Sequence, residues 1–192
     1  MEYLTRMDEL AAVNLILAAM TEAPVSSLSG NLATQVIAAK QKLQITSIEV
    51  QTEGWLFNTE DNFPLPQDRD GNVAIPQNAM SVDFNQEHDR DPIDRGSKAY
   101  DRLNHTYKFD RPLYASIKFG LAFDEMPQSA RSYIAVRASR SAQMENLGSG
   151  ELARFSQRDE DRARAVFVAE QAVDQKLNFL NRTNGFKAIM KV

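Results

Sequence analysis

The chain has 192 residues, of which 43% are hydrophobic and 25% are charged, the composition of an ordinary globular protein. Its 22 basic and 26 acidic residues give a net charge of −4, which argues against a protein built to coat nucleic acid. With no cysteine and only two histidines, the chain has no disulfide, thiolate nucleophile, cysteine-bound zinc or histidine-rich metal site. The longest apolar run, Leu15–Met20, is too short to cross a membrane, so we expect a soluble protein made in the cytoplasm.

Residues 1–54 have the periodicity of two helices. In the first, apolar residues recur at spacings of three and four and share one face: Leu10, Val13, Leu17 and Met20. Thr21–Gly30, with a proline, three serines and a glycine, predicts a loop. A second apolar series follows at near-heptad spacing: Leu32, Val36, Ala39, Leu43 and Val50. Gly54 is a suitable residue to end that helix in a left-handed conformation.

Residues 55–123 change character and predict a small antiparallel β domain inserted between helices. This zone contains five of the seven prolines, and its apolar runs are short. Tyr114, Ser116 and Lys118 alternate with Ala115, Ile117 and Phe119, the period of a half-buried strand. Within the zone, residues 85–98 are highly charged and interrupted by Pro92 and Gly96, which predicts a long mobile loop.

Residues 124–192 return to a helical pattern. Pro127 suits a helix start, and the expected buried face carries Ala130, Tyr133, Ile134 and Ala138. After a break at residues 148–150, a last helix is predicted to bury one further series: Leu152, Phe155, Ala163, Val166, Val173, Leu177 and Leu180. A helix of about 30 residues would be about 45 Å long, as long as the whole body, and so indicates assembly with a partner. The fold class is therefore α+β: a helical bundle, an inserted β domain and a long C-terminal helix.

Two patterns of catalytic or metal-binding type are better explained as structure. Asp68–Asn72 begins like a calcium-binding loop, but the twelfth position is Ala79, which cannot be a ligand. His88 with Asp89, and Asp101 with His105, could each form a general-base pair. The chain has no Gly-x-Ser-x-Gly element and no cysteine for such a base to activate. No cofactor or metal is expected.

The carboxylates of the β zone leave one enzymatic alternative open. A glycan hydrolase needs two carboxylates at a suitable separation across a sugar-binding cleft, and the zone is rich in acids. Arginines are interleaved with these acids, so a solvated, ion-paired surface explains the same residues. An interaction protein is the favoured interpretation, and a peripheral glycan hydrolase is the alternative.

An ordered series of short elements carries a resemblance to a known family. Glu9–Ala18 reads E-L-A-A-V-N-L-I-L-A, and Glu22–Leu28 reads E-A-P-V-S-S-L. Gly54–Asn58 reads G-W-L-F-N. Further elements follow in order: Gly71–Pro76, Ser81–Asp83, Tyr100–Arg102, Thr106–Asp110, Asp124–Pro127, Tyr133–Ile134 and Ala138–Arg140. Together they resemble the tail tubular A proteins of short-tailed podoviruses over nearly the whole chain, with the weakest match at residues 181–192.

The resemblance implies a structural adaptor, or gatekeeper, of a phage virion with no catalytic role. In that family twelve copies form a ring between the portal of the capsid and the nozzle made by tail tubular protein B. Tail fibres attach near the ring, and double-stranded DNA passes through its channel during genome ejection. The implied partners are thus other copies of the chain, the portal protein, tail tubular protein B and the tail fibre protein.

Two sets of residues are the candidates for these contacts. The first set is apolar, lies near the polar C-terminus and is expected to dock on the portal or a neighbouring subunit: Phe179, Leu180, Phe186, Ile189 and Met190. The second set lies in the charged segment 85–98 and is expected to contact the fibre or nozzle: Asp89, Arg90, Asp91, Asp94 and Arg95.

Overall fold

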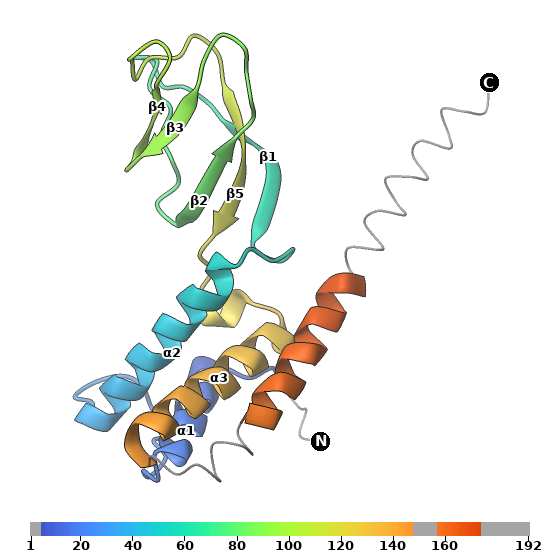
Figure 1. The fold of residues 1–192 in the computed structure, drawn as a ribbon. Coiled ribbons are helices and arrows are strands. Elements are labelled where there is room, and N and C mark those ends of the chain that lie inside the picture. Colours follow the sequence, from blue (N-terminus) through green and yellow to red (C-terminus); the bar gives the residue numbers. More distant parts are fainter. Residues whose placement is uncertain (1–4, 148–156, 174–192) are drawn as a thin grey trace, which may run out of the picture. The chain divides into compact units, whose positions relative to one another are not determined.

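The computed structural model describes residues 5–147 and 157–173, and divides the chain into two compact units. One unit combines Met1–Val50 with Ala122–Val192, and the other is Gln51–Leu121. The elements with their bounds are α1 (Glu9–Ala19), α2 (Thr34–Thr52), β1 (Thr59–Leu65), β2 (Ala79–Phe84), β3 (Pro92–Arg95), β4 (Lys98–Asp101), β5 (Leu113–Phe119), the 3-10 helix η1 (Phe123–Glu125) and α3 (Gln128–Leu147) (Figure 1). A further helix covers residues 157–173. This architecture confirms the predicted α+β class with a C-terminal helix.

The helical unit is built on the contact between α1 and α3. The Asp8 side chain caps α1 by accepting a hydrogen bond from the Ala11 N–H at 2.7 Å, which satisfies a donor that the helix cannot. On α3 the predicted buried face is confirmed: Ala130, Tyr133, Ile134 and Ala138 are all buried. The helix α2 buries the predicted Val36, Ala39, Leu43 and Val50.

Arg131, at the start of α3, ties three chain segments together. It is only 5% exposed, and its Nε donates to the Met126 carbonyl at 2.7 Å. Its Nη1 donates to the Met7 carbonyl at 2.8 Å, and its Nη2 donates to the Asp124 carbonyl. One buried guanidinium group therefore holds a carbonyl within η1, the carbonyl directly after it and a carbonyl of the segment that precedes α1.

The helix over residues 157–173 packs on α3 through a different face from the predicted one. Phe167 is fully buried and stacks on Tyr133, with ring centroids 5.7 Å apart. Val166 and Val173, predicted to be buried, are 58% and 56% exposed, so that prediction is wrong. The helix turns Phe167 toward α3 in place of the two valines, because an aromatic ring stacked on Tyr133 buries more apolar area than a valine could. The rest of the predicted last helix lies outside the described residues.

The β unit contains a three-stranded antiparallel sheet in the order β1–β5–β2. Strand β5 is central and alternates as predicted, with Leu113, Ala115, Ile117 and Phe119 buried. Ile117 pairs with Glu60 on one side and with Val82 on the other. Residues of the loops and of β4 complete the core: Leu65, Val73, Ala99 and Phe109.

The segment 85–98 is not one long loop, which corrects the sequence prediction. Strands β3 and β4 form an antiparallel hairpin in which Pro92 pairs with Asp101 and Arg95 with Lys98. The two residues between them are Gly96 and Ser97, and Gly96 has a φ of +75°, the left-handed geometry that tight hairpins need. The Gly-Ser pair is itself a hairpin signal, hidden in the sequence by the charged residues around it.

Candidate functional site

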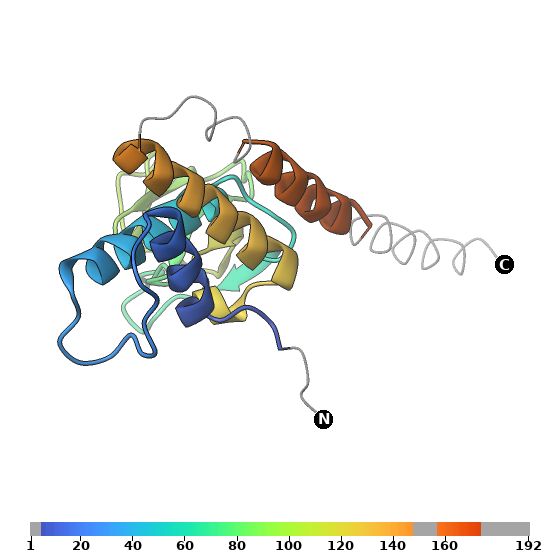
Figure 2. The ribbon, with the colours of Figure 1, turned by 90° about the horizontal axis from the view of Figure 1, so that it is seen from below.

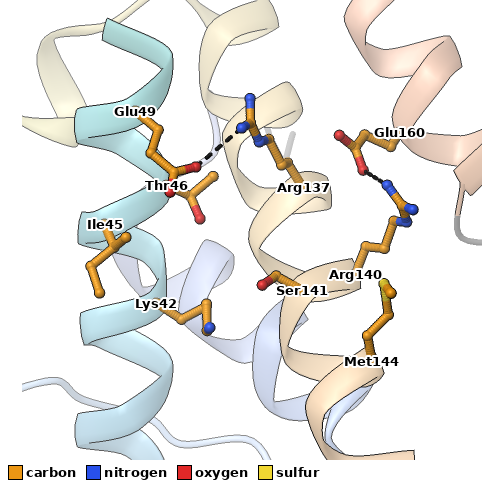
Figure 3. Close-up of a pocket in the computed structure, with 9 residues that line it drawn as sticks. All are labelled: Lys42, Ile45, Thr46, Glu49, Arg137, Arg140, Ser141, Met144 and Glu160. Carbon is orange, nitrogen blue, oxygen red and sulfur yellow. Dashed lines mark hydrogen bonds and ion pairs between the residues drawn. The ribbon is translucent and has the colours of Figure 1, made fainter. Parts of the chain in front are cut away.

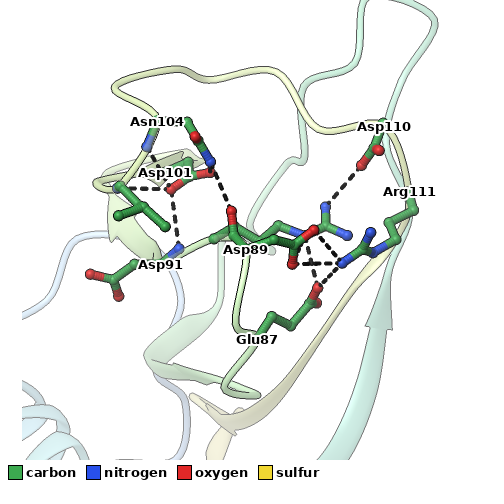
Figure 4. Close-up of polar contacts among 9 residues, drawn as sticks. Glu87, Asp89, Asp91, Asp101, Asn104, Asp110 and Arg111 are labelled. Atoms are coloured by element: carbon green, nitrogen blue, oxygen red, sulfur yellow. Dashed lines mark hydrogen bonds and ion pairs between the residues drawn. The ribbon is translucent and has the colours of Figure 1, made fainter.

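Two of the five candidate contact residues of the β unit, Asp89 and Arg90, belong to a network of arginines and carboxylates (Figure 4). Arg90 is 5% exposed and its Nε donates to Glu87 Oε2 at 2.8 Å. Its Nη1 lies 3.2 Å from Asp110 Oδ1, an ion pair without hydrogen-bond geometry. Arg111 Nη2 donates to Glu87 Oε2 at 2.7 Å and to Asp89 Oδ1 at 2.8 Å. This network folds residues 87–90 onto the segment 110–111.

The network raises the pKa of Arg111, mainly through its hydrogen bond to Glu87 and then through Asp89. Arg90 is buried by its packing, and Asp89 is held by Arg111. Arg90, one of the five residues predicted to meet a fibre or nozzle, is therefore part of the internal structure of the β unit, whereas the Asp89 side chain is 61% exposed although Arg111 holds it. Sequence spacing could not show this because Arg111 is more than twenty residues away from both acids.

Asp101 organises the turn that follows β4. Its Oδ1 accepts the backbone N–H groups of Asp91 at 3.1 Å, Leu103 at 2.9 Å and Asn104 at 3.3 Å. Its Oδ2 accepts the Asn104 side-chain amide at 2.7 Å. Burial alone would raise the pKa of Asp101, but these hydrogen bonds outweigh it and hold the pKa below its ordinary value. Such a carboxylate is a weak base and serves structure.

Asp91, a third predicted contact residue, also has an internal partner. Its Oδ2 lies 2.6 Å from Arg102 Nη2 and accepts from Arg102 Nε at 2.8 Å. Both side chains are about half exposed, so this pair contributes little to stability but fixes the orientation of the carboxylate.

The last two predicted residues, Asp94 and Arg95, are neighbours on β3 and are both exposed. The guanidinium carbon of Arg95 lies 3.7 Å from the centre of the Tyr100 ring, and Tyr100 meets Tyr107 edge to face. A hydrogen bond to Tyr107 is the main cause that raises the pKa of Arg95. Asp94 and Arg95 are exposed, and Asp89 and Asp91 are also accessible to a partner although each is paired with an arginine.

A glycan hydrolase is not favoured by the carboxylates of this unit. Its general acid needs a raised pKa, so that the group stays protonated near neutral pH. The pKa of Asp68 is lowered by the backbone N–H of Asn72, and that of Asp101 by the bonds described above. Glu87 and Asp89 are bridged by Arg111, which ties both carboxylates into an ion-paired network rather than leaving them to face a sugar-binding cleft.

A cleft of about 330 Å³ lies in the helical unit between α2, α3 and the start of the helix over 157–173 (Figure 3). Its basic residues face carboxylates. Arg137 Nη2 lies 3.1 Å from Glu49 Oε2, and Arg140 Nη1 lies 2.6 Å from Glu160 Oε2. Lys42, also on the wall, lies 2.5 Å from Glu145. The cleft is therefore charge-balanced, which does not favour binding of a phosphate or other anion.

The pKa of Arg137 reflects this balance. Burial would lower it, but a hydrogen bond to the Tyr133 hydroxyl and the charges of Glu49 and Glu160 raise it. Within residues 5–147 and 157–173, no three side chains of the histidine, aspartate or glutamate type lie close enough together to hold a metal ion. The same residues contain no helix that is both long and apolar enough to span a membrane.

Comparison with known proteins gives the chain its family. The sequence model of the tail tubular protein family matches residues 10–177. The chain belongs to the tail tubular protein family. It is also similar to tail tubular protein A of Klebsiella phage KP34, with 25% identity over 178 residues that cover 90% of this chain and 91% of that protein.

In this tail tubular protein, the sequence elements that carry the resemblance contact one another. The side chain of Asn14, in the A-V-N-L-I-L element, makes two hydrogen bonds to the backbone of Val25, in the P-V-S-S-L element. One runs from Asn14 Nδ2 to the Val25 carbonyl at 2.9 Å, and the other from the Val25 N–H to Asn14 Oδ1 at 2.8 Å. These two hydrogen bonds fix the loop after α1 against the helix, so the two sequence elements form one structural unit.

The G-W-L-F-N element has a similar structural role in the β unit. Asn58 is buried, and its Nδ2 donates to the Gln51 carbonyl at 2.9 Å and to the Phe119 carbonyl at 3.0 Å. Gly54 has a φ of +81°, and a Cβ there would lie 2.4 Å from the Cε of Lys118. The element therefore joins the end of α2 to β5. Sequence reasoning identified these elements as a pattern but did not mark Phe167, which no recognised pattern includes.

The apolar C-terminal candidates, Phe179, Leu180, Phe186, Ile189 and Met190, lie outside the described residues. Their role in this tail tubular protein stays a prediction.

Proposed function

We propose that this protein is the adaptor of a phage tail, whose copies form a ring, a dodecamer, between the portal and the nozzle. The family is one of tail components, so the chain is a structural protein of the virion tail. The observation that carries the proposal is the family match over residues 10–177, which includes parts of both units. DNA would pass through the ring during ejection.

The charge pattern supports a conduit rather than a DNA-binding protein. Each phosphate contact from lysine or arginine adds a salt-dependent attraction that would slow a moving duplex. The chain carries a net charge of −4. Arg137, Arg140 and Lys42 are held by carboxylates in the helical unit, and Arg90 and Arg111 are held in the β unit.

We assign two contacts within the tail. The apolar residues of the C-terminal segment, from Phe179 to Met190, dock on the portal or on a neighbouring subunit. The β3–β4 hairpin meets tail tubular protein B or the tail fibre through Asp94 and Arg95, since Arg90 is buried and the exposed Asp89 and Asp91 are already paired with Arg111 and Arg102. Asp94→Lys should weaken that contact while leaving the fold intact, whereas Asp89→Lys should perturb the fold of the β unit.

The mass of the complex formed with the portal ring of the same phage tests the proposal. Mixing the two proteins should add about twelve chains per portal ring, measured by light scattering, and negative-stain images should show one docking face. A chain that ends at Leu180 should remain folded but bind the portal more weakly. Absence of binding at every salt concentration would overturn the adaptor assignment, and polysaccharide cleavage should then be assayed.

A further inference from the structure

The outward face of α2 carries no charged side chain between residues 34 and 48. The side chains that point away from the core between residues 34 and 48 are Thr34, Ile37, Ala38, Gln41, Gln44, Ile45 and Ile48. Ile37, Ile45 and Ile48 are 45%, 54% and 49% exposed. In a chain with 25% charged residues, an exposed helix face without charge has the composition of the centre of a protein interface.

A second exposed apolar surface lies on the helix over residues 157–173. The first half of this helix is highly charged, but its second half exposes small apolar residues: Ala165, Val166, Val168, Ala169, Ala172 and Val173. Three alanines form the floor of this surface, opposite the buried Phe167, and the valines form its two edges. Glu170 is the one charged residue between positions 165 and 173.

The two surfaces lie on opposite flanks of the helical unit. In both views α3 lies between α2 and the helix over 157–173 (Figures 1 and 2). Phe167 faces Tyr133 on α3, so the alanine floor points away from α3. The α2 face points away from its own buried residues, Val36, Ala39 and Leu43. One copy therefore presents its isoleucines on one flank and its alanine floor on the other.

We infer that these are the two halves of one head-to-tail contact, in which the α2 face of one copy packs on the second half of the 157–173 helix of the next. This inference rests on the proposed ring, because a ring needs a contact between two different surfaces of the same chain. The surfaces match in charge, since the isoleucines and alanines at their centres are uncharged and the exposed carboxylates of Glu49 and Glu170 lie at their edges. They also match in size, because large isoleucine side chains fill the space that alanines leave.

The alternative occupants fit less well. DNA would need cations to hold its phosphates, and the α2 face offers none. A symmetric contact of two α2 faces would place isoleucine against isoleucine and would close a dimer, which cannot continue around a ring. Ile45 also lies on the wall of the helical cleft with Met144, which is 53% exposed, so the incoming helix would extend the apolar contact along that edge (Figure 3).

Cysteine cross-linking tests the contact directly, because the natural chain has no cysteine. One full-length chain carries Ile45→Cys, and a second, with a size tag, carries Ala169→Cys. They are mixed at about 100 µM and oxidised. We expect the mixed disulfide dimer to form at least tenfold faster than with a control pair in which Leu103→Cys, exposed to a similar degree at 57%, replaces Ile45→Cys. Equal labelling of all three thiols by a maleimide controls for their accessibility.

Two outcomes would overturn the inference. A mixed dimer that forms no faster than the control pair shows that the surfaces do not meet. A chain with Ile45→Cys that links to itself as fast as to Ala169→Cys shows a symmetric contact. The portal measurement is separate. Cross-linking without portal binding would support this contact and reject the adaptor role. Portal binding without cross-linking would support the adaptor role and reject this contact.

Discussion

Asp101 shows how one carboxylate can fix a turn that the surrounding sequence leaves irregular. It is 3% exposed and accepts three backbone N–H groups and one side-chain amide. A buried acceptor with several donors is costly to lose, because each donor left behind has no water to replace it. The Tyr-Asp-Arg element around Asp101 therefore has a structural explanation.

Replacing Asp101 by asparagine tests this role through its pH dependence. The folded-state pKa lies below the ordinary value of 3.8, so the folded protein binds fewer protons than the unfolded chain near that pH. The stabilisation is present above about pH 4 and is lost as the pH falls through the folded-state pKa. Asp101→Asn should lower the free energy of unfolding by about 1–3 kcal/mol at pH 7, and by less at pH 3.

Urea unfolding followed by the fluorescence of Trp55, the single tryptophan, reports this change in the β unit. Asp94→Asn, on the exposed side of β3, is the matched control and should change stability by less than about 0.5 kcal/mol. If Asp101→Asn costs the same at pH 3 as at pH 7, the ionised carboxylate is not the stabilising species.

At the scale of elements, the sequence predicts the structure best where a single hydrophobic periodicity, of a strand or of a helix, continues through the whole element. Strand β5 alternates over its whole length because both neighbours in the sheet are strands, and its core residues follow that alternation. The same holds for α3, whose buried face is set by its contact with α1. In both cases local propensity and tertiary packing favour the same residues.

The sequence is insufficient to predict the structure where contacts between residues far apart in the chain determine it. The β3–β4 hairpin was predicted as a loop, because its exposed charges concealed a two-residue turn. The apolar series that includes Val166 and Val173 predicts one buried face for the helix over 157–173, but the stacking contact between Phe167 and Tyr133 determines which face is buried. The contacts of Arg90 with Asp110 and of Arg111 with Glu87 join residues about twenty positions apart, which no periodicity predicts.

Phe167 should therefore decide whether the helix over 157–173 stays docked on α3. Removing a buried phenylalanine side chain costs about 3–5 kcal/mol, and a loss of about 3 kcal/mol raises the rate of local opening by roughly 100-fold. In Phe167→Ala, amide hydrogen exchange should accelerate by about that factor in residues 157–173, while α1 and α3 keep most of their protection.

Val166→Ala is the matched control on the neighbouring, 58% exposed position, and its exchange should change by less than about threefold. Equal acceleration in α1 and α3 by Phe167→Ala would mean that the helix belongs to the same cooperative unit as the bundle. No acceleration at all would mean that other contacts hold it.

At the scale of the whole molecule, the features described here are those of a part in an assembly. Its charged clusters are largely satisfied internally, and its exposed uncharged surfaces lie on helices. These features agree with a tail component that works through contacts with other proteins. The proposed passage of DNA through a ring also requires that the chain tolerate nucleic acid rather than bind it.

Binding to duplex DNA tests that last distinction. With a net charge of −4 and basic residues such as Arg90, Arg137 and Arg140 paired with carboxylates, the chain should show no saturable binding to a 30-base-pair duplex at 150 mM salt. Fluorescence anisotropy with protein up to about 100 µM would measure it. Glu49→Gln together with Glu160→Gln removes the partners of two arginines, so weak binding should appear at 50 mM salt and fade as salt rises. Saturable binding by the unchanged chain at 150 mM salt would contradict a conduit that lets the duplex slide.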